Sequence, residues 1–274
     1  MTPFKMYVID SGSMWLDEAL VVTGAHQATS KNQHPEAGWV ELPVSVFYFD
    51  HPQGKILFDT ACDGVQQSQV DQTADRISPY IFTQEQLLPS RLEALKLKPD
   101  DIDYVVLSHL HADHAGNLHL FKKSEVIVSE TEFTQSVKLY ALKQRYGAYS
   151  FKDFENFIAA DLNWNLIPDQ EIERPLVDGI TLVNLGPGHG FGMLALLVEL
   201  PKSGNFLLVS DAIYTELNMG PPIRLPGIIH DSVGYRNTVG FVAQYAKKHN
   251  AKIVFGHNIK QFNEFIKSDK GFYE

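Results

Sequence analysis

The sequence predicts an α/β fold. Short apolar segments rich in β-branched residues alternate along the chain with segments in which apolar residues recur at helical spacing. Several of the short segments lead directly to a histidine or an aspartate, as in α/β folds that place functional side chains at strand ends. With 44% hydrophobic and 20% charged residues in 274, the composition is that of a globular protein with a substantial core. No linker-like stretch divides the chain, so we expect residues 1–274 to form a single domain.

The first half of the chain predicts a hairpin, a helix and a buried strand. Residues 43–50 and 55–58 are apolar and β-rich, and the turn-forming residues 51–54 between them indicate an antiparallel pair. Residues 90–97 have the apolar spacing of a helix, which Pro99 and two aspartates end. Residues 104–107 then form a short apolar run, which predicts a buried strand.

Two further helices are expected in the middle of the chain. Residues 131–145 have helical spacing, and a second helical stripe of large apolar side chains follows them. This stripe has two interpretations, because it can be part of the core or a lid over a bound apolar ligand. It consists of Phe151, Phe154, Phe157 and Ile158.

Three strands are predicted in the second half, and each leads to a side chain that can bind a metal ion. Singly, such residues are more often loop histidines or helix caps. Together they indicate a site, because strand ends in α/β folds converge on one edge. The strands and the side chains that follow them are residues 180–185 with His189, 205–210 with Asp211, and 251–255 with His257.

The densest cluster of potential metal ligands in the sequence is the run Ser108-His109-Leu110-His111-Ala112-Asp113-His114. Three imidazoles and a carboxylate stand within six residues of the chain, directly after the strand predicted at 104–107. Histidine and aspartate are ordinary zinc ligands, and several of them must converge from short, stiff backbone to hold the ion. A polar loop with incidental histidines is the weaker interpretation, so the run predicts a metal site.

Composition also excludes several classes of partner. A formal charge of −10 argues against a nucleic-acid backbone as the main ligand. Cys62 is the only cysteine, which excludes an intrachain disulfide framework and a thiolate zinc site. No apolar run has the length of a membrane span, and the first residues meet Asp10 too soon for a signal-peptide core. We therefore expect a cytoplasmic protein with no membrane and no nucleic-acid partner.

The order of these histidines and aspartates resembles the dinuclear site of the metallo-β-lactamase superfamily over nearly the whole chain. The resemblance implies an αβ/βα four-layer sandwich, in which two sheets pack face to face with helices outside. It also implies two divalent metal ions, with zinc as the expected metal. The implied ligands are His109, His111, Asp113, His114, His189, Asp211 and His257.

Within that superfamily the chain is most similar to N-acyl homoserine lactonases, the quorum-quenching enzymes. Residues 108–117, 211–215 and 255–257 match the segments in which that family has its ligands and an active-site tyrosine. Tyr214, three residues after Asp211, is the discriminating match. One departure is Met193. It stands where the family often has a second histidine, in the segment that contains His189.

The resemblance implies a metal-dependent carboxylic ester hydrolase that opens the lactone ring of N-acyl homoserine lactones. The implied nucleophile is a hydroxide that bridges the two metals. Tyr214 is then a catalytic residue that donates a hydrogen bond to the developing oxyanion. Asp113 is expected to have a second catalytic role, passing a proton to the leaving oxygen.

Two related activities stay open at this point, because they need the same metal ligands. One is a lactonase for another lactone, such as a pyridoxine-derived one. The other is glyoxalase II-like thioester hydrolysis, for which Lys260, Lys267 and Lys270 could bind substrate carboxylates. The partner in each case is a small molecule. Met14 and Trp15 are candidates for the pocket wall or for a contact between subunits, so a homodimer is one assembly that the sequence allows.

Overall fold

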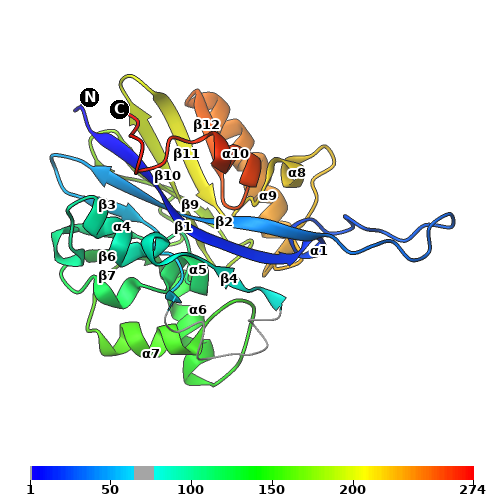
Figure 1. Ribbon diagram of the computed structural model, residues 1–274. Coiled ribbons are helices and arrows are strands. Elements are labelled where there is room, and N and C mark those ends of the chain that lie inside the picture. The colour runs from blue at the N-terminus through cyan, green and yellow to red at the C-terminus, as the bar shows by residue number, and fades with distance from the viewer. Residues whose placement is uncertain (1, 65–76) are drawn as a thin grey trace.

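The computed structural model describes residues 2–64 and 77–274, and within these ranges the strands form two sheets (Figure 1). Among these residues, the larger sheet has seven strands in the order β4-β1-β2-β3-β5-β6-β7, and the smaller has five in the order β12-β11-β10-β9-β8. The larger sheet contains β1 (Lys5–Asp17), β2 (Trp39–Asp50), β3 (Ile56–Phe58), β4 (Tyr80–Ile81), β5 (Tyr104–Val106), β6 (Glu125–Ser129) and β7 (Asn163–Ile167). The smaller sheet contains β8 (Glu173–Val177), β9 (Ile180–Gly186), β10 (Met193–Leu200), β11 (Gly204–Ser210) and β12 (Ala251–Phe255).

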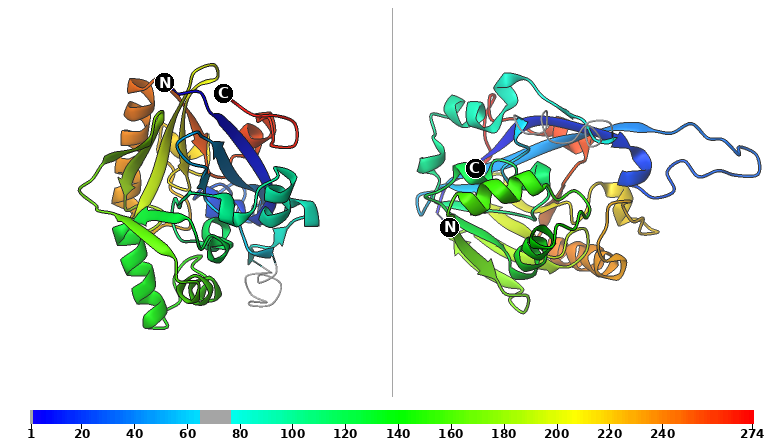
Figure 2. Two further views of the ribbon diagram at one scale, coloured as in Figure 1. Left: turned by 90° about the vertical axis from the view of Figure 1, so that its left-hand side faces the viewer. Right: turned by 90° about the horizontal axis from the view of Figure 1, so that it is seen from below.

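Helices cover the outer faces of both sheets, as the two views of Figure 2 show. Buried side chains of α4 and α7 pack against the larger sheet, and those of α9 pack against the smaller one. The longer helices are α4 (Leu88–Ala94), α6 (Glu130–Ala141), α7 (Phe151–Ala159) and α9 (Ser232–Lys248). The shorter ones are α1 (Glu18–Val21), α5 (Ala112–Ala115), α8 (Glu216–Met219) and α10 (Ile259–Glu264).

Strand β10 shows how the sequence produces four layers. Its side chains alternate between two cores, as the period of two in a strand requires. Leu194, Leu196 and Val198 pack in the core between the two sheets. Ala195 and Leu197 point the other way and pack in the core beneath α9. The α/β fold is therefore confirmed, and so is the αβ/βα four-layer sandwich that the resemblance implied.

The predicted elements are present, with two helix boundaries corrected. Strands β2 and β3 form the expected antiparallel hairpin. The helix predicted at 90–97 covers Leu88–Ala94, and the one predicted at 131–145 ends at Ala141. Lys96 and Lys143, with φ of 60° and 56°, turn the backbone into the left-handed region just after these helices. Apolar spacing does not report where the backbone makes that turn.

The aromatic stripe of α7 belongs to the core. Phe154 and Phe157 are each 1% exposed and pack with the outer core of the larger sheet, whereas Ile158 is exposed. The lid interpretation is therefore wrong for the two buried rings. Met14, a candidate for the pocket wall or a subunit contact, packs in the same core.

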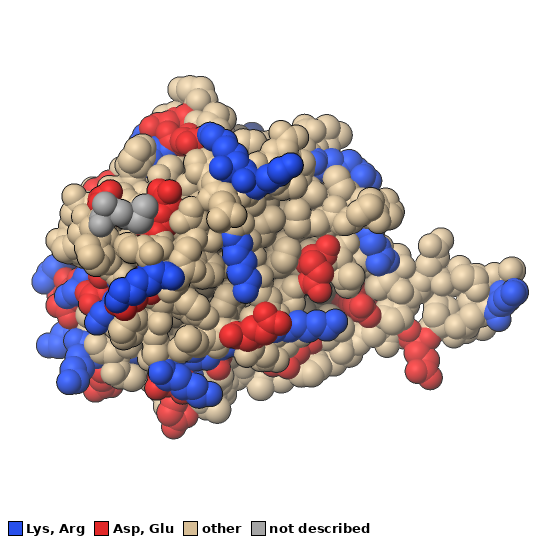
Figure 3. Space-filling model, turned by 90° about the horizontal axis from the view of Figure 1, so that it is seen from above, with Lys and Arg blue, Asp and Glu red and all other residues tan. Residues whose placement is uncertain are grey.

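The surface carries charged side chains of both signs (Figure 3). Figure 3 shows acidic and basic side chains intermixed on one face, and a segment that projects away from the body. Figure 1 places this projection between α1 and β2. Among the described residues, no helix combines the length and the apolar character needed to cross a bilayer.

Candidate metal centre

The structure brings the seven predicted ligands together at the ends of strands from both sheets. Within the described ranges they form two groups, and in each group the ligand atoms lie within 4.8 Å of one another. We call these the imidazole group and the mixed group. Each residue is at most 6% exposed. The imidazole group is His109, His111 and His189, and the mixed group is Asp113, His114, Asp211 and His257.

The chain positions these side chains through short loops after its strands. The loop after β5 carries His109 and His111, and the short helix α5 that follows carries Asp113 and His114. Asp211 follows β11 directly, and His189 and His257 stand in the short loops after β9 and β12. Because the strand ends are fixed by the sheets, the converging side chains need little further ordering.

Three ring nitrogens converge in the imidazole group. His111 Nδ1 lies 3.0 Å from His109 Nε2 and 2.8 Å from His189 Nε2. The His189 ring has its other nitrogen fixed, because Nδ1 lies 3.0 Å from the carbonyl oxygen of Ile228 and can only donate to it. The Nε2 of neutral His189 therefore presents a lone pair to the other rings, which is the form that binds a metal.

The mixed group combines two carboxylates with two imidazoles. Asp113 Oδ2 lies 3.0 Å from His114 Nε2 and 3.4 Å from His257 Nε2. The outer nitrogen of each ring is held: His257 Nδ1 lies 3.0 Å from the carbonyl oxygen of Pro43, and His114 Nδ1 lies 2.8 Å from Asp59 Oδ2. Both rings thus direct Nε2 into the site.

Asp211 lies between the two groups. Its Oδ2 is 3.3 Å from His189 Nε2 of the imidazole group. Its Oδ1 is 3.0 Å from His257 Nε2 and 3.3 Å from His114 Nε2. Oδ2 also lies 3.2 Å from His257 Nε2, so this carboxylate contacts both groups, as expected of a ligand shared by two cations.

The donor atoms fit divalent cations. Among the described residues, the buried atoms His114 Nε2 and Asp211 Oδ1 have no hydrogen-bond partner, although close neighbours surround them. Buried polar atoms normally have hydrogen-bond partners, so these two atoms are suited to binding a cation. Imidazole and carboxylate are the ligands that zinc and related ions accept. Both groups can therefore hold a metal.

Burial and charge shift the pKa values of the two groups differently. Burial lowers the pKa of His109, His111 and His189, and the neighbouring imidazoles add to the decrease for His109 and His111. For His257, burial also acts to lower the pKa, but Asp211 and Asp113 outweigh it and raise the value to about 10. The imidazole group is therefore neutral, whereas the mixed group holds protons when no metal is bound.

Burial and neighbouring charges also shift the pKa values of the other members of the mixed group. The carboxylates around His114 outweigh burial and raise its pKa. Burial acts to raise the pKa of Asp113 and Asp211, but the neighbouring histidines outweigh it and lower both values. Both carboxylates are thus ionised at neutral pH, which is the form that binds a cation.

Tyr214 lies beside both ligand groups. It is 3% exposed, and its ring centroid is 5.1 Å from the rings of both His189 and His257. Burial raises the pKa of its phenol, and the nearby Asp211 carboxylate raises it further. The hydroxyl therefore keeps its proton at neutral pH and can donate a hydrogen bond beside the two groups.

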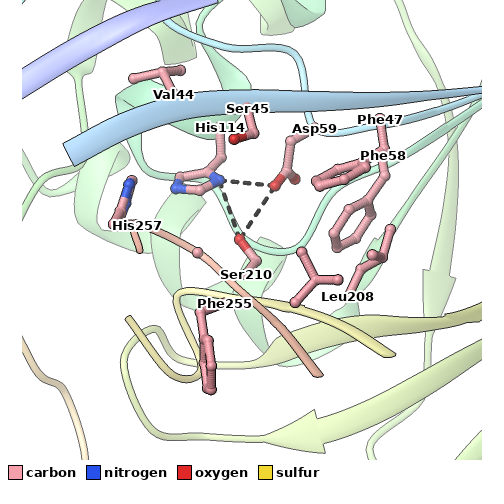
Figure 4. Close-up of a pocket in the computed structure, with 12 residues that line it drawn as sticks. Val44, Ser45, Phe47, Phe58, Asp59, His114, Leu208, Ser210, Phe255 and His257 are labelled. Carbon is pink, nitrogen blue, oxygen red and sulfur yellow. Dashed lines mark hydrogen bonds and ion pairs between the residues drawn. The ribbon is translucent and has the colours of Figure 1, made fainter. Parts of the chain in front are cut away.

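A polar network behind His114 was not predicted from the sequence. Figure 4 shows Asp59, His114 and Ser210 around one pocket. Besides its contact with His114, Asp59 accepts hydrogen bonds from the Ser108 amide at 2.7 Å and from the Ser108 hydroxyl at 2.9 Å. Asp59 and Ser210 both adopt the left-handed backbone region, with φ of 64° and 48°. Such strain in non-glycine residues is typical of functional sites, but it leaves no mark in the sequence.

Comparisons with known proteins agree with this geometry. The family model of the metallo-beta-lactamase superfamily matches residues 39–257. The chain is 41% identical over 279 residues to the N-acyl homoserine lactonase AiiB of Rhizobium rhizogenes, covering 98% of this chain and 99% of the relative. It is 28% identical over 270 residues to an N-acyl homoserine lactonase of Bacillus thuringiensis, covering 95% and 96%. It also superimposes with a TM-score of 0.82, at 26% identity and full coverage of both chains, on an N-acyl homoserine lactone hydrolase with the product N-hexanoyl-L-homoserine bound at its catalytic metal center.

Proposed function

This chain belongs to the N-acyl homoserine lactonase family of the metallo-beta-lactamase superfamily, and we propose that it is a metal-dependent hydrolase that opens the lactone ring of N-acyl homoserine lactones. The observation that carries this proposal is the pair of ligand groups that share Asp211 and lie beside Tyr214. Such a pair is suited to hydrolysis of an ester, because it can act on both the carbonyl and the attacking water.

The ligand assignment follows from the two groups. His109, His111 and His189 would hold one cation, and Asp113, His114 and His257 the other, with Asp211 shared. We propose zinc for both positions, because the donors are imidazole nitrogens and carboxylate oxygens in small groups. When bound, the cations polarise the ester carbonyl and lower the pKa of a water molecule, so that hydroxide is available near neutral pH.

Tyr214 would stabilise the charge that develops on the carbonyl oxygen. Its phenol stays protonated at neutral pH because burial and Asp211 raise its pKa. A protonated hydroxyl donates a hydrogen bond, and donors placed before the reaction contribute most where charge develops. The ring is packed between His189 and His257, which holds the hydroxyl in place without further ordering.

Asp113 would move a proton as well as bind a cation. A carboxylate has two oxygens, so one can be a ligand while the other takes the proton that the attacking water loses. As the bond between the carbonyl carbon and the ring oxygen breaks, that proton passes to the ring oxygen, which becomes the hydroxyl of the product. The new carboxylic acid then releases one proton to solvent.

One of the three lysines that the thioester alternative would use, Lys267, is engaged within the protein. Lys267 Nζ donates to the backbone oxygens of Phe262 and Phe265 and lies 3.9 Å from the centroid of the Phe262 ring. Burial lowers the pKa of this amine. Lys267 is therefore engaged within its own segment rather than directed at a substrate carboxylate.

The direct test measures proton release by purified, metal-analysed protein. The panel contains short- and long-chain N-acyl homoserine lactones, an unsubstituted γ-lactone, a pyridoxine-derived lactone, a thioester and a phosphodiester. We expect the N-acyl homoserine lactones to be opened fastest, by protein that carries about two metals per chain. A clear preference for another substrate at the same metal content would overturn the proposed substrate but retain the metal centre.

A further inference from the structure

Glu132 is a buried carboxylate close to the metal centre that the proposed mechanism does not use. It stands in the first turn of α6 and is 0% exposed. A buried carboxylate loses several kcal/mol of hydration unless hydrogen bonds replace the lost water. Its contacts therefore indicate what this side chain stabilises.

The carboxylate accepts four hydrogen bonds, two on each oxygen. Oε1 accepts from the Leu110 amide at 2.9 Å and from the Tyr149 hydroxyl at 2.9 Å. Oε2 accepts from the Phe191 amide at 2.8 Å and from the Gly192 amide at 3.1 Å. Both oxygens are thereby saturated by neutral donors from three separate chain segments.

Each of these segments adjoins a ligand of the imidazole group. Leu110 stands between His109 and His111 in the chain, and Phe191 follows His189 by two residues. The Tyr149 ring packs edge-on against the His111 ring, with centroids 4.4 Å apart at 71°. One carboxylate thus connects all three imidazoles through their nearest neighbours.

The loop after His189 is shaped to approach this carboxylate closely. A Cβ atom on Gly190 would lie 3.0 Å from Glu132 Oε2. A Cβ atom on Gly192 would lie 2.2 Å from Ser129 Oγ, at the start of α6. Glycine at both positions lets the backbone amides reach the first turn of α6, so the loop and Glu132 form one fitted contact.

We propose that Glu132 is a positioning residue that holds His109, His111 and His189 in the arrangement that binds one of the two cations. This inference rests on the proposed metal ligation. A carboxylate is required because it accepts from all four donors at once. A glutamine directs its amide N–H groups at one pair of donors, and backbone amides cannot rotate away from them.

The test compares Glu132→Gln with Glu130→Gln, which makes the same chemical change at an exposed position of the same helix turn. Both variants are titrated with Co²⁺ at pH 8.5 against a competing chelator, and visible absorption reports the geometry of each bound ion. Burial raises the pKa of Glu132 to about 7, so the wild-type carboxylate is ionised at this pH.

We expect Glu132→Gln to weaken the binding of one cation by roughly 10–100-fold and to change its absorption spectrum, as loss of an outer contact of a metal ligand does. The second cation should bind as in wild type, and Glu130→Gln should match wild type for both. Two wild-type affinities and spectra in Glu132→Gln would overturn the proposal, and so would an equal loss at both positions.

Tyr149→Phe keeps the inference testable if Glu132→Gln does not fold. This variant removes one of the four hydrogen bonds and leaves the other three. We expect a weaker effect confined to the same cation, whereas unchanged binding of that cation would overturn the proposal. The readout is cation affinity, so a failure of the protein to hydrolyse N-acyl homoserine lactones would refute the proposed function and leave this result standing.

Discussion

The imidazole group and the mixed group are adjacent, but they differ in what holds them together without a metal. In the mixed group, raised pKa values at His114 and His257 let protons pair with two carboxylates. In the imidazole group, burial lowers the pKa of every ring, and nitrogens 2.8 and 3.0 Å apart face one another. The mixed group can therefore substitute protons for a cation, whereas the imidazole group depends on surrounding structure for its shape.

The supporting carboxylates differ in the same way. Asp59 contacts the ring of His114 directly and fixes which nitrogen faces the cation. Glu132 contacts backbone amides and Tyr149 and so fixes where the rings stand. The mixed group is therefore tuned through its charge, and the imidazole group through its geometry.

The largest effect is expected from Asp211→Asn, because Asp211 directs an oxygen to each group. The amide is neutral and directs an N–H group at one set of donor atoms. We expect the variant to lose cations from both groups and kcat/KM to fall on the order of 10³-fold, which corresponds to several kcal/mol of lost transition-state stabilisation. Metal analysis after gel filtration and proton-release kinetics measure both losses. Retention of two metals with unchanged turnover would show that the groups are not joined through this carboxylate.

Tyr214→Phe should affect turnover without affecting either group. The phenylalanine ring keeps the packing against His189 and His257 but cannot donate a hydrogen bond. We expect wild-type metal content and a decrease in kcat of about 10²-fold, as for loss of one oxyanion donor. Full activity on the best substrate would refute the role assigned to Tyr214.

Asp59→Asn tests whether the mixed group is tuned through charge. The neutral amide no longer stabilises the tautomer of His114 that directs Nε2 into the site. We expect one cation to bind roughly 10–100-fold more weakly, with the imidazole group unaffected. Asp161→Asn is the matched control, because Asp161 is exposed and also has a left-handed backbone, with φ of 55°. Equal effects in the two variants would show that the loss does not depend on the contact between Asp59 and His114.

The sequence predicted the ligands but not their supports, for a physical reason. The ligands must be histidine or aspartate, and they follow recognisable strands, so residue type and position together identify them. Asp59 and Glu132 are ordinary carboxylates in the sequence. Their partners Ser108 and Phe191 lie 49 and 59 residues away, and only the packing of the two sheets brings them into contact.

Strand β10 was not predicted from the sequence, and the reason is also physical. The first six residues of β10, residues 193–198, are buried on both faces of the strand and form a continuous apolar run that does not alternate with polar residues. Such a run does not distinguish a strand from a buried helix segment. The fold class could still be predicted, because the other strands and helices alternate along the chain even when β10 is left out.

Asp153→Asn should have the smallest effect on the metal centre and separates its chemistry from the stability of the fold. Asp153 is 5% exposed on α7, outside both ligand groups, and burial raises its pKa from 3.8 to about 7. The folded state therefore holds this proton more tightly than the unfolded chain. The stabilisation is complete below pH 4 and is lost as the pH rises through 7.

Asparagine does not titrate, so Asp153→Asn should be more stable than wild type at pH 8. A shift of about three pKa units at 1.36 kcal/mol each sets an upper limit of about 4 kcal/mol. Urea unfolding at pH 5 and pH 8 measures the change, with Glu155→Gln, at an exposed position of the same helix, as the control. Metal content and kcat should stay at the wild-type level. A variant that loses a cation would instead place Asp153 among the supports of the mixed group, and the division between the two groups would have to be redrawn.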